Sequence, residues 1–544
     1  MAWKKVHLTV VGLCLINLFC SLKIGYADVN WIKYSYFQNW GGLNDQLSAI
    51  EIQDNEASDI QNVIFDTGGA IKKRFGFLTI PNNPVEKVST GSVVALTGLG
   101  FYQKNNSNKY VVAITNNDGK ATAMKKTWNA GAALGSWDNI DAAILPLSYT
   151  NNNLPDFAVA EDNLVITIPA TAQNKPFKYT GSGKVSFLTT DTDCPEATIV
   201  EYHKNHLFLA GDDDFPSRIY FSALDDITNY TATDFFDVQT ADGTKTRGLV
   251  SAYDSLYVFK DKSMWRLSGQ ERDTFILQKM VDGIGTLSQQ SIAVVNNIIY
   301  FTTAQGDKAV YDGAYTVKYI SSKISNTISD LNLTRSLYAL GINFDDNFYS
   351  SISDGGSATN NLVLLFDTIY NAWTQFVGIN ANAWCIAQDS NEQDVLIFGD
   401  YSGYAYSYPS ANYFDGNVIT DPIIAFYQTK WFRYSDIALG DKYWRLLKTY
   451  ALSETTTNTL LYAECKSDYE ESGKIVSINL SESGALWDVA FWDVDIWAGQ
   501  GLKIGRNEVE KGKDMFQIRY SNDKVDEGFT IFGFENFIEP TNRI

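Results

Sequence analysis

Residues Gly248 to Gln270 read GLVSAYDSLYVFKDKSMWRLSGQ and contain the clearest strand pattern of the chain. Two runs rich in aromatic and branched residues, Ser255 to Phe259 and Ser263 to Leu267, flank the polar link Lys260-Asp261-Lys262. Strand-forming residues on both sides of so short a link are typical of a β-hairpin. The segment therefore predicts antiparallel sheet.

The same pattern extends in both directions, roughly from residue 91 to residue 410. Short apolar or alternating runs are separated by Asn, Asp and Gly, and few segments could sustain a long amphipathic helix. Clear examples are Tyr110 to Thr115, Leu164 to Ile168, His206 to Ala210, Arg218 to Ser222, Ile298 to Thr302, Leu362 to Phe366 and Val395 to Phe398. Groups of runs recur every 40 to 55 residues or so, about the length of a four-stranded propeller blade. We expect an all-β fold with a β-propeller of about six or seven degenerate blades, and a tandem of sandwiches is the competing architecture.

Beyond Asp415-Gly416 the expected strands become longer, which favours a separate C-terminal β-sandwich-like domain. They are Ile423 to Trp431, Tyr443 to Leu452, Leu460 to Ala463, Ile475 to Leu480, Phe516 to Tyr520 and Phe529 to Phe534. The expected division of the chain is a signal peptide at 1–27, an N-terminal arm with a helical turn and a hairpin at 28–90, the propeller at 91–410 and the sandwich at 411–544.

Within the N-terminal arm, Asp54 or Asn55 can cap a short helix. Ala57 and Ile60 are three residues apart, the spacing of one helix face. A helical turn is therefore expected to lead directly into a strand at Val63 to Phe65.

That strand is expected to form a hairpin with Ile71 to Phe77, because Thr67-Gly68-Gly69 tolerates the positive φ of a reversal. Lys72, Lys73 and Arg74 are interpreted as a solvated strand end, with a contact to an acidic neighbouring subunit as the alternative.

The first 27 residues have the pattern of a secretory signal. Lys4 and Lys5 precede an apolar run from Leu8 to Leu22, and Gly25-Tyr26-Ala27 is a small-x-small cleavage site, so the mature chain is expected to begin near Asp28. No later stretch is long and apolar enough to predict a membrane span.

Composition restricts the classes of function. The chain carries 43 Lys and Arg against 63 Asp and Glu, a formal charge of −20. Such a surface disfavours a tight grip on DNA phosphates and is compatible with the wall of a conduit along which DNA slides. With an aromatic fraction of 14% and only 11 prolines, the composition favours packed sheet over disorder.

Residues that could carry chemistry are few. Beyond the signal only His203 and His206 remain, and they are expected as satisfied surface residues at a turn. Asp212-Asp213-Asp214 is expected as a solvated turn, because consecutive aspartates lack the alternating spacing of a calcium loop. Core packing is the expected role of Trp431, Trp444, Trp487, Trp492 and Trp497, with an exposed patch as the alternative, and Cys194, Cys385 and Cys465 are expected as buried thiols. No catalytic, cofactor or metal residue is therefore assigned, and the sequence predicts a protein that is not an enzyme.

The segment Trp40 to Ile80 carries a family resemblance in its Gly-Gly-Leu-Asn start, Asp-Asn-Glu-Ala segment, Asn-Val-x-Phe-Asp strand and Lys-Arg-x-Gly-Phe end. In that order these elements resemble bacteriophage tail nozzle proteins of the tail tubular protein B type. The runs His206 to Val238, Gly248 to Gln270 and Leu362 to Phe376 are similar to blades of the same family.

The resemblance implies a structural virion protein of a short-tailed phage, with copies that form a homo-oligomeric ring around the DNA exit channel. It also implies contacts with an adaptor or portal on one side and with fibres or a tip on the other, while DNA passes without sequence-specific binding. An export signal does not fit virion assembly in the host cytoplasm. The alternative is therefore a secreted bacterial β-propeller that binds a polysaccharide or a surface partner.

Overall fold

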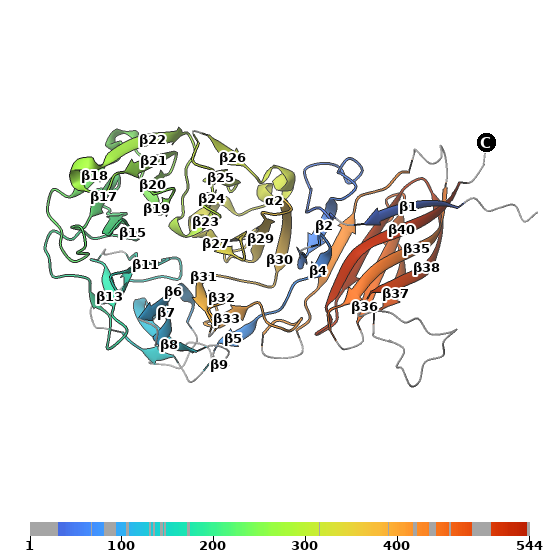
Figure 1. Ribbon diagram of the computed structural model, residues 1–544, viewed down its shortest axis with the longest axis horizontal. Coiled ribbons are helices and arrows are strands. Elements are labelled where there is room, and N and C mark those ends of the chain that lie inside the picture. Colours follow the sequence, from blue (N-terminus) through green and yellow to red (C-terminus); the bar gives the residue numbers. More distant parts are fainter. Residues whose placement is uncertain are drawn as a thin grey trace, which may run out of the picture.

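The computed structural model describes residues 31–540, except 38, 67, 81–93, 105–107, 130–131, 134–136, 142–144, 146–147, 171–173, 315, 390, 417–420, 435–441, 456–458 and 481–501. Within the described part, seven antiparallel sheets surround a common axis as the blades of a β-propeller (Figure 1). The expected all-β propeller is confirmed. The hairpin at Ser255 to Leu267 is also present, as β20 and β21 of the fourth blade.

Each blade follows the chain from the inner strand outwards. Blade one contains β6 (Leu96–Lys104), β7 (Asn108–Asn117), β8 (Lys120–Asn129), β9 (Ala132–Ala133) and β10 (Asp138–Asn139). Blade two contains β11 (Asp156–Ala160), β12 (Asn163–Thr167), β13 (Phe177–Tyr179) and β14 (Ser186–Phe187). Blade three contains β15 (Ile199–His203), β16 (His206–Ala210), β17 (Arg218–Phe221) and β18 (Phe235–Asp237). Blade four contains β19 (Thr246–Ala252), β20 (Ser255–Lys260), β21 (Ser263–Ser268) and β22 (Ile276–Asp282).

The remaining blades complete the circle. Blade five contains β23 (Ala293–Val295), β24 (Ile298–Thr302), β25 (Lys308–Tyr311) and β26 (Val317–Tyr319). Blade six contains β27 (Leu340–Phe344), β28 (Asn347–Ile352), β29 (Leu362–Asp367) and β30 (Ala372–Val377). Blade seven contains β31 (Ala383–Gln388), β32 (Asp394–Gly399), β33 (Ala405–Tyr408) and β5 (Leu78–Ile80). Short helical turns connect blades: η1 (Thr240–Asp242), η3 (Gln289–Ser291), η4 (Ser322–Ile324), α2 (Ser325–Ser329) and η5 (Leu333–Tyr338). A further turn, η2 (Arg272–Thr274), lies within blade four, between β21 and β22.

Blade seven closes the propeller because its outer strand comes from the other end of the domain. β5 pairs antiparallel with β33, so that Leu78 lies opposite Ser407 and Ile80 opposite Ala405. Phe77, just before β5, packs edge-on against Phe398 at a centroid distance of 5.0 Å. The first and last parts of the propeller are thus held in one sheet.

The C-terminal domain is a β-sandwich, also as expected. Its six-stranded sheet has the order β3-β4-β40-β35-β38, and β1 pairs with β40 beside β4; the five-stranded sheet has the order β2-β34-β39-β36-β37. The strands are β1 (Ile32–Phe37), β2 (Ala57–Gln61), β3 (Val63–Phe65), β4 (Ile71–Lys73), β34 (Ala425–Thr429), β35 (Lys442–Ser453), β36 (Leu460–Ser467), β37 (Lys474–Asn479), β38 (Lys503–Lys513), β39 (Phe516–Asn522) and β40 (Phe529–Pro540).

The described strands of the segment 28–90, expected as an N-terminal arm, belong to both modules. Its strands β1 to β4 are integral to the two sandwich sheets, and β5 belongs to the propeller. The hairpin of β3 and β4 is confirmed, with Val63 opposite Lys73. The expected helical turn is wrong, because Ala57 and Ile60 lie on β2. A β-bulge between Ala57 and Asp59 adds one residue, and this places two buried side chains three positions apart in a strand.

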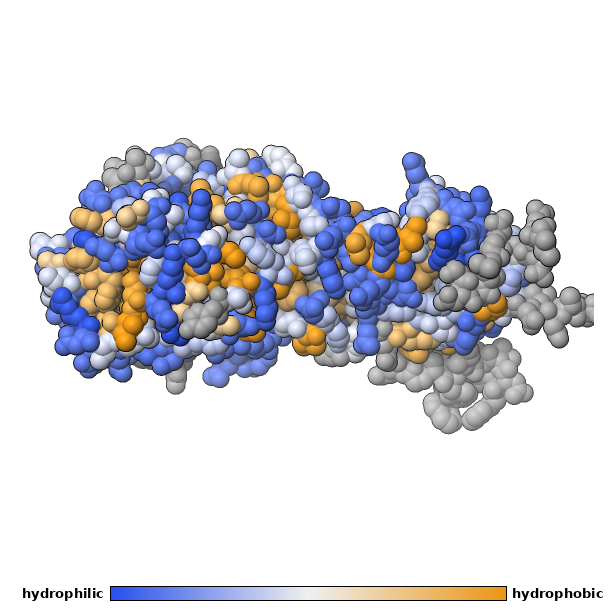
Figure 2. Space-filling model, turned by 90° about the horizontal axis from the view of Figure 1, so that it is seen from above, coloured by the Kyte–Doolittle hydropathy of each residue, from blue (hydrophilic) through white to orange (hydrophobic). Residues whose placement is uncertain are grey.

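The signal peptide predicted at 1–27 lies outside the described residues. Among the residues that are described, no helix is long and apolar enough to cross a membrane. Seen from above (Figure 2), the propeller and the sandwich form one elongated body whose surface mixes polar and apolar side chains.

Candidate functional site

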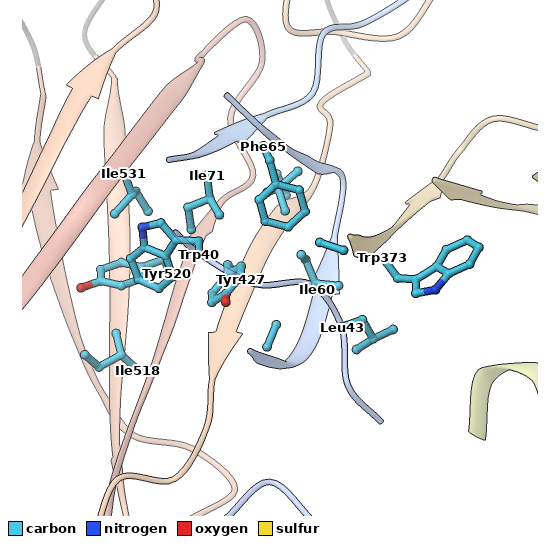
Figure 3. Packing of buried hydrophobic residues seen from close by; sticks show 14 of the residues in the cluster. Trp40, Leu43, Ile60, Phe65, Ile71, Trp373, Tyr427, Ile518, Tyr520 and Ile531 are labelled. Atoms are coloured by element: carbon cyan, nitrogen blue, oxygen red, sulfur yellow. The ribbon is translucent and has the colours of Figure 1, made fainter. Parts of the chain in front are cut away.

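The propeller and the sandwich share one hydrophobic core. It runs from Tyr300 and Phe366 in blades five and six, through Trp373 on β30, to Tyr427 and Phe534 inside the sandwich. Figure 3 shows the middle of this cluster, where side chains from the N-terminal segment lie between those of the sandwich strands and Trp373. We call the segment from Trp40 to Arg74 the junction segment. It fills the boundary between the two modules.

The start of the junction segment lies directly against β30. The Leu43 N–H donates to the Trp373 carbonyl at 2.8 Å, and the Ala57 N–H donates to the Gly42 carbonyl at 3.0 Å. A Cβ on Gly42 would come within 2.3 Å of the Trp373 nitrogen, so this close approach of two backbones requires glycine. The Gly-Gly-Leu-Asn motif is therefore a packing element between blade six and the sandwich.

Asn62 connects four pieces of chain. It lies between β2 and β3 with a left-handed φ of 54°, a conformation that asparagine tolerates. Its N–H donates to the Gln375 carbonyl at 2.8 Å, and its side-chain oxygen accepts from the Val377 N–H at 3.0 Å, both on β30. Its amide nitrogen donates to the Ile424 carbonyl at 2.9 Å at the start of the sandwich. In the sequence, Asn62 stands out only as part of the Asn-Val-x-Phe-Asp motif.

Arg74 is the second connection and is completely buried. Its two terminal nitrogens donate to the two Asp415 carboxylate oxygens at 2.8 and 2.6 Å. Further donations reach the Asn62 side-chain oxygen at 2.9 Å, the Phe75 carbonyl at 3.0 Å and the Val377 carbonyl at 3.3 Å. All five N–H groups of the guanidinium thus have an acceptor. The Arg74–Asp415 ion pair joins the junction segment, the last propeller blades and the link to the sandwich.

The expectation of a solvated basic strand end is wrong for Lys73 and Arg74, which are both buried. Lys73 donates to the Asn522 side-chain oxygen at 2.6 Å and to the Lys524 carbonyl at 3.1 Å. Burial lowers the pKa of Lys73 to about 7, although nearby carboxylates act in the opposite direction. Lys72 forms an ion pair with Glu454 at 2.7 Å. These cations bind within the chain, because the strand that carries them is covered by the sandwich.

The acidic part of the motif anchors the junction segment to the connection between blades five and six. Glu56 is buried, accepts from Asn44 Nδ2 at 2.8 Å and pairs with Lys323 Nζ at 2.9 Å. Although burial opposes it, these contacts lower the Glu56 pKa. Asp45 accepts from the Asn326 and Thr327 N–H groups at 2.9 and 2.8 Å, at the start of α2.

The propeller axis offers a second candidate site. Polar side chains near the inner strands bind the backbone of the neighbouring blade. Asp156, Glu201 and Gln289 accept from the N–H groups of Val200, Ser251 and Leu249 at 3.0, 3.1 and 2.7 Å. Asn343 and Asn382 donate to the carbonyls of Val294 and Leu96 at 3.0 and 2.7 Å. No sequence motif pointed to these residues, since each lies alone in its blade.

Two cavities follow one another along this axis. The inner one, of about 350 Å³, is lined by β6, β11, β27 and β31 and includes Asp156 and Trp384. The outer one, of about 310 Å³, lies where the inner strands begin. Leu154, Gln289 and Gln290 line both cavities, and Gln290 Nε2 donates across the axis to the Pro155 carbonyl at 3.2 Å. The Gln290 side chain therefore lies at the boundary between the two cavities.

Two acidic residues of adjacent inner strands have strongly shifted pKa values. Burial raises the pKa of Asp156 to about 7. Burial, and then the neighbouring Asp156 carboxylate, raises the pKa of Glu201 to about 8. At neutral pH the pair therefore holds at least one proton much of the time.

His203 and His206 lie opposite each other at the β15–β16 turn and are buried, which corrects their expected surface position. Phe208 contacts both imidazole rings, and His206 also contacts Phe221 and, from blade four, Phe275. His206 binds the Ser222 and Gln270 carbonyls at 2.6 and 2.9 Å, and His203 Nδ1 lies 2.7 Å from Ser251 Oγ. Burial lowers the His203 pKa to about 4.

The other residues singled out from the sequence fall into structural positions. Asp212 accepts from the Tyr220 hydroxyl at 2.6 Å, and the Asp213 side chain is 69% exposed in its turn and pairs with Lys245. Trp431 and Trp444 are buried in the sandwich, as expected from core packing. Trp487, Trp492 and Trp497 lie outside the described residues. The thiols Cys194, Cys385 and Cys465 are confirmed as free and buried. Within the described part of the chain, no group of three or more His, Cys, Asp or Glu side chains could hold a metal ion.

Comparison with known proteins yields structures alone, since no protein-family description and no curated protein matches. An exo-β-1,3-galactanase from Phanerochaete chrysosporium aligns at 8% identity over 85% of this chain and 100% of its own, with a TM-score of 0.26. BBS1N in complex with ARL6DN aligns at 11% over 61% and 96%, with a TM-score of 0.37. The extracellular domain of a two-component system from B. thetaiotaomicron aligns at 11% over 74% and 43%, with a TM-score of 0.32. At these values the alignments carry no argument about function.

One sequence-based conclusion is nevertheless corrected. The sequence predicted that the protein is not an enzyme, because no catalytic motif is present. The alignment with an exo-β-1,3-galactanase counts against this conclusion, which is withdrawn, and it assigns no activity to this chain. The absence of a linear motif does not exclude catalysis, because propeller sites are assembled from isolated residues of several blades.

Proposed function

We propose that this chain is a structural component of a virion, the tail nozzle or hub of a short-tailed phage, whose copies form a ring around the DNA exit channel. The observation that carries the proposal is the position of the junction segment. The motif on which the family resemblance rests is the same segment that fastens the sandwich to the propeller, through Asn62 and the pair Arg74–Asp415.

A tail component must keep its shape while force passes through it during DNA ejection. A flexible linker would allow the two modules to move independently. Here the continuous core and the buried ion pair oppose such motion, since an unpaired buried charge would cost about 3–5 kcal/mol. A ring of wedge-shaped subunits requires that each subunit keep one fixed shape.

The charge of the chain supports the same role. A formal charge of −20 favours a surface along which DNA slides without sticking. In this proposal, one end of the ring contacts an adaptor or portal and the other contacts fibres or a tip. The protein is located in the virion tail.

Peptide-mapping mass spectrometry of density-gradient-purified particles from the source culture tests the proposal. We expect peptides of this chain at several copies per particle, measured against a known virion protein. Detection only in the particle-free secreted fraction would reject the tail role. The most N-terminal peptide answers a second question, because a start at Asp28 would demonstrate that 1–27 is removed by export processing.

A second candidate is a secreted bacterial propeller that binds a polysaccharide or a surface partner. The channel cavity favours it, because Trp384 lines the cavity and its buried Nε1 has no hydrogen-bond partner among the described residues. Glycan-array binding of the full chain, compared with a Trp384→Phe variant, tests this candidate. Absence of any glycan signal would reject it.

A further inference from the structure

The six-stranded sheet of the sandwich has an outer strand on each side without a strand partner in the described part of the chain. On one side β38 pairs only with β35. On the other side β1 pairs only with β40. Unpaired strand edges present N–H and C=O groups that readily pair with another chain.

The directions of the two edge strands are compatible with pairing between copies. β1 is antiparallel to β40, β40 is antiparallel to β35, and β35 is antiparallel to β38. β1 and β38 therefore run in opposite directions. If the sheet of one copy continued into that of the next copy with its strand directions preserved, β38 of the second copy would meet β1 of the first as an antiparallel neighbour.

The exposed side chains of the two strands match in one register. Both strands alternate between partly covered and exposed residues, with Lys33, Ser35 and Phe37 exposed on β1. Placing Ser35 opposite Arg506 brings Lys33 opposite Glu508 and Phe37 opposite Ile504. Phe37 and Ile504 are 44% and 53% exposed, so both side chains are available for an apolar contact with another chain.

Other registers are less favourable. A shift of two residues in one direction places Lys33 opposite Arg506, which opposes two like charges. A shift by two residues in the other direction keeps a pair of opposite charges, Lys33 with Glu510, but it places Phe37 opposite Arg506 and separates it from Ile504. A shift by one residue would put exposed side chains opposite covered ones. The pattern of charge and apolar surface therefore selects one alignment.

We propose that β1 of one copy pairs with β38 of the next copy, head to tail, in the register that sets Ser35 opposite Arg506. The proposal deepens the tail role and rests on it for the ring. Because two different edges meet, the contact is heterologous, and repetition of it closes into a ring when the rotation between copies permits. The occupant of each edge is a second copy of this chain.

Two contacts within a single copy are compatible with the pairing of β1 and β38 between copies. Lys474 Nζ donates to the Glu508 carbonyl at 2.8 Å, and a carbonyl oxygen has a second lone pair for an incoming N–H. Lys33 Nζ pairs with Glu535 Oε1 at 2.9 Å, and its side chain remains 53% exposed. A neighbouring Glu508 would add a second carboxylate to this exposed cation.

Cysteine cross-linking of the full chain tests the pairing. The variant Ser35→Cys with Arg506→Cys is prepared in a background in which Cys14 and Cys20 are Ser; the other three cysteines are buried. Side chains directly opposite on antiparallel strands lie within disulfide reach. We expect mild oxidation to convert most of the monomer into a ladder of covalent oligomers. A mixture of the two single variants should give dimers alone.

The matched control combines Ser35→Cys with Ser182→Cys, an exposed position in the turn between β13 and β14 of blade two. We expect its cross-linking yield to be at least tenfold lower. Equal yields in the two variants, or no ladder from the first, would overturn the pairing. A charge exchange adds a second readout: Lys33→Glu and Glu508→Lys should each raise the protein concentration needed for assembly several-fold, and the double exchange should restore it.

The two proposals fail separately. If particles contain the chain and their tails yield no Ser35–Arg506 cross-link, the pairing is wrong and the tail role stands. If the purified chain forms the ladder while particles lack the chain, the tail role is wrong and the pairing stands.

Discussion

Arg74 and Asn62 illustrate how single residues join two modules. Neither makes a contact typical of a surface strand end, and each binds both the propeller and the link to the sandwich. The stabilisation that Arg74 provides depends on the geometry of its hydrogen bonds, because the guanidinium is buried and each of its N–H groups has an acceptor. Substitutions that preserve charge and change shape should therefore be costly.

For Arg74→Lys we expect a loss of about 2–4 kcal/mol in the free energy of unfolding, because one ammonium cannot replace a bidentate pair and three further bonds. Urea unfolding followed by tryptophan fluorescence measures it. The matched control is Arg433→Lys, whose side chain is 65% exposed and pairs with Asp514. That change should stay within about 0.5 kcal/mol. Equal effects at the two sites would contradict the role of Arg74.

Glu201 predicts a pH dependence of stability. Its folded pKa of about 8 lies above the unfolded value of 4.5, so the folded state binds more protons than the unfolded state between these pH values. The contribution of the protonated Glu201 to the free energy of unfolding is therefore fully present below pH 4.5 and is lost as the pH rises to 8. Glu201→Gln should reduce the stability lost over this window by about 4–5 kcal/mol, since the two pKa values differ by about 3.5 (8 − 4.5) and one pKa unit corresponds to about 1.4 kcal/mol.

Chemical unfolding of wild type and Glu201→Gln at several pH values measures this difference. The amide can still accept from the Ser251 N–H, so the packing of the blade is retained. Parallel stability curves for the two proteins would contradict the shifted pKa. Asp156→Asn, at the neighbouring carboxyl, should give a change of the same sign because burial raises its pKa as well.

At the scale of elements, the sequence predicted local structure well. The hairpin at Ser255 to Leu267 and the strands of most blades have alternating or branched runs bounded by polar turns. The bulged strand β2 was mistaken for a helix, because an inserted residue gives apolar side chains a spacing of three. Local strand propensity also contains no information about which strands pair when they lie far apart in the sequence. The pairing of β5 with β33, and of β1 with β40, was therefore not predicted.

The candidate site was predicted less well than the fold. Arg74 was assigned to a solvated end because basic residues are rarely buried, and its partner Asp415 was assigned to a domain boundary. One sequence signal could have revealed the Arg74–Asp415 pair. Each of the two residues lies close to a glycine, Gly76 or Gly416, at a turn next to a strand. Asp156 and Glu201 have no such signal, because their proximity depends on the closure of the propeller.

The pairing of β5 with β33, which closes the propeller, can be tested with a disulfide. The variant Leu78→Cys with Ser407→Cys places two cysteines opposite each other on β5 and β33. Its oxidised form should be more stable to heat than its reduced form by about 2–4 kcal/mol, since the disulfide joins distant parts of the chain. Differential scanning calorimetry with and without reductant measures this. The absence of any difference would show that unfolding does not begin by opening this closure.

At the scale of the whole molecule, the shared core predicts one coupled unfolding transition for propeller and sandwich. Tyr300 and Trp373 on the propeller side and Phe534 in the sandwich belong to one cluster. Asp415→Asn removes the charge opposite Arg74 and should separate the transition into two, as measured by calorimetry. Two transitions in the wild type would contradict a single rigid body, and Asp254→Asn, at a side chain that is 87% exposed and pairs with Lys204, is the control.

The tail role itself depends on where this rigid body lies in a particle. The most direct measurement is a cryo-electron microscopy reconstruction of the tails of gradient-purified particles from the source culture. We predict a ring of repeated units around the DNA path, each of which accommodates a seven-bladed propeller and its sandwich, with sandwich sheets adjacent between neighbours. A tail reconstruction resolved well enough to trace its proteins, with no unit of this shape, would contradict the account.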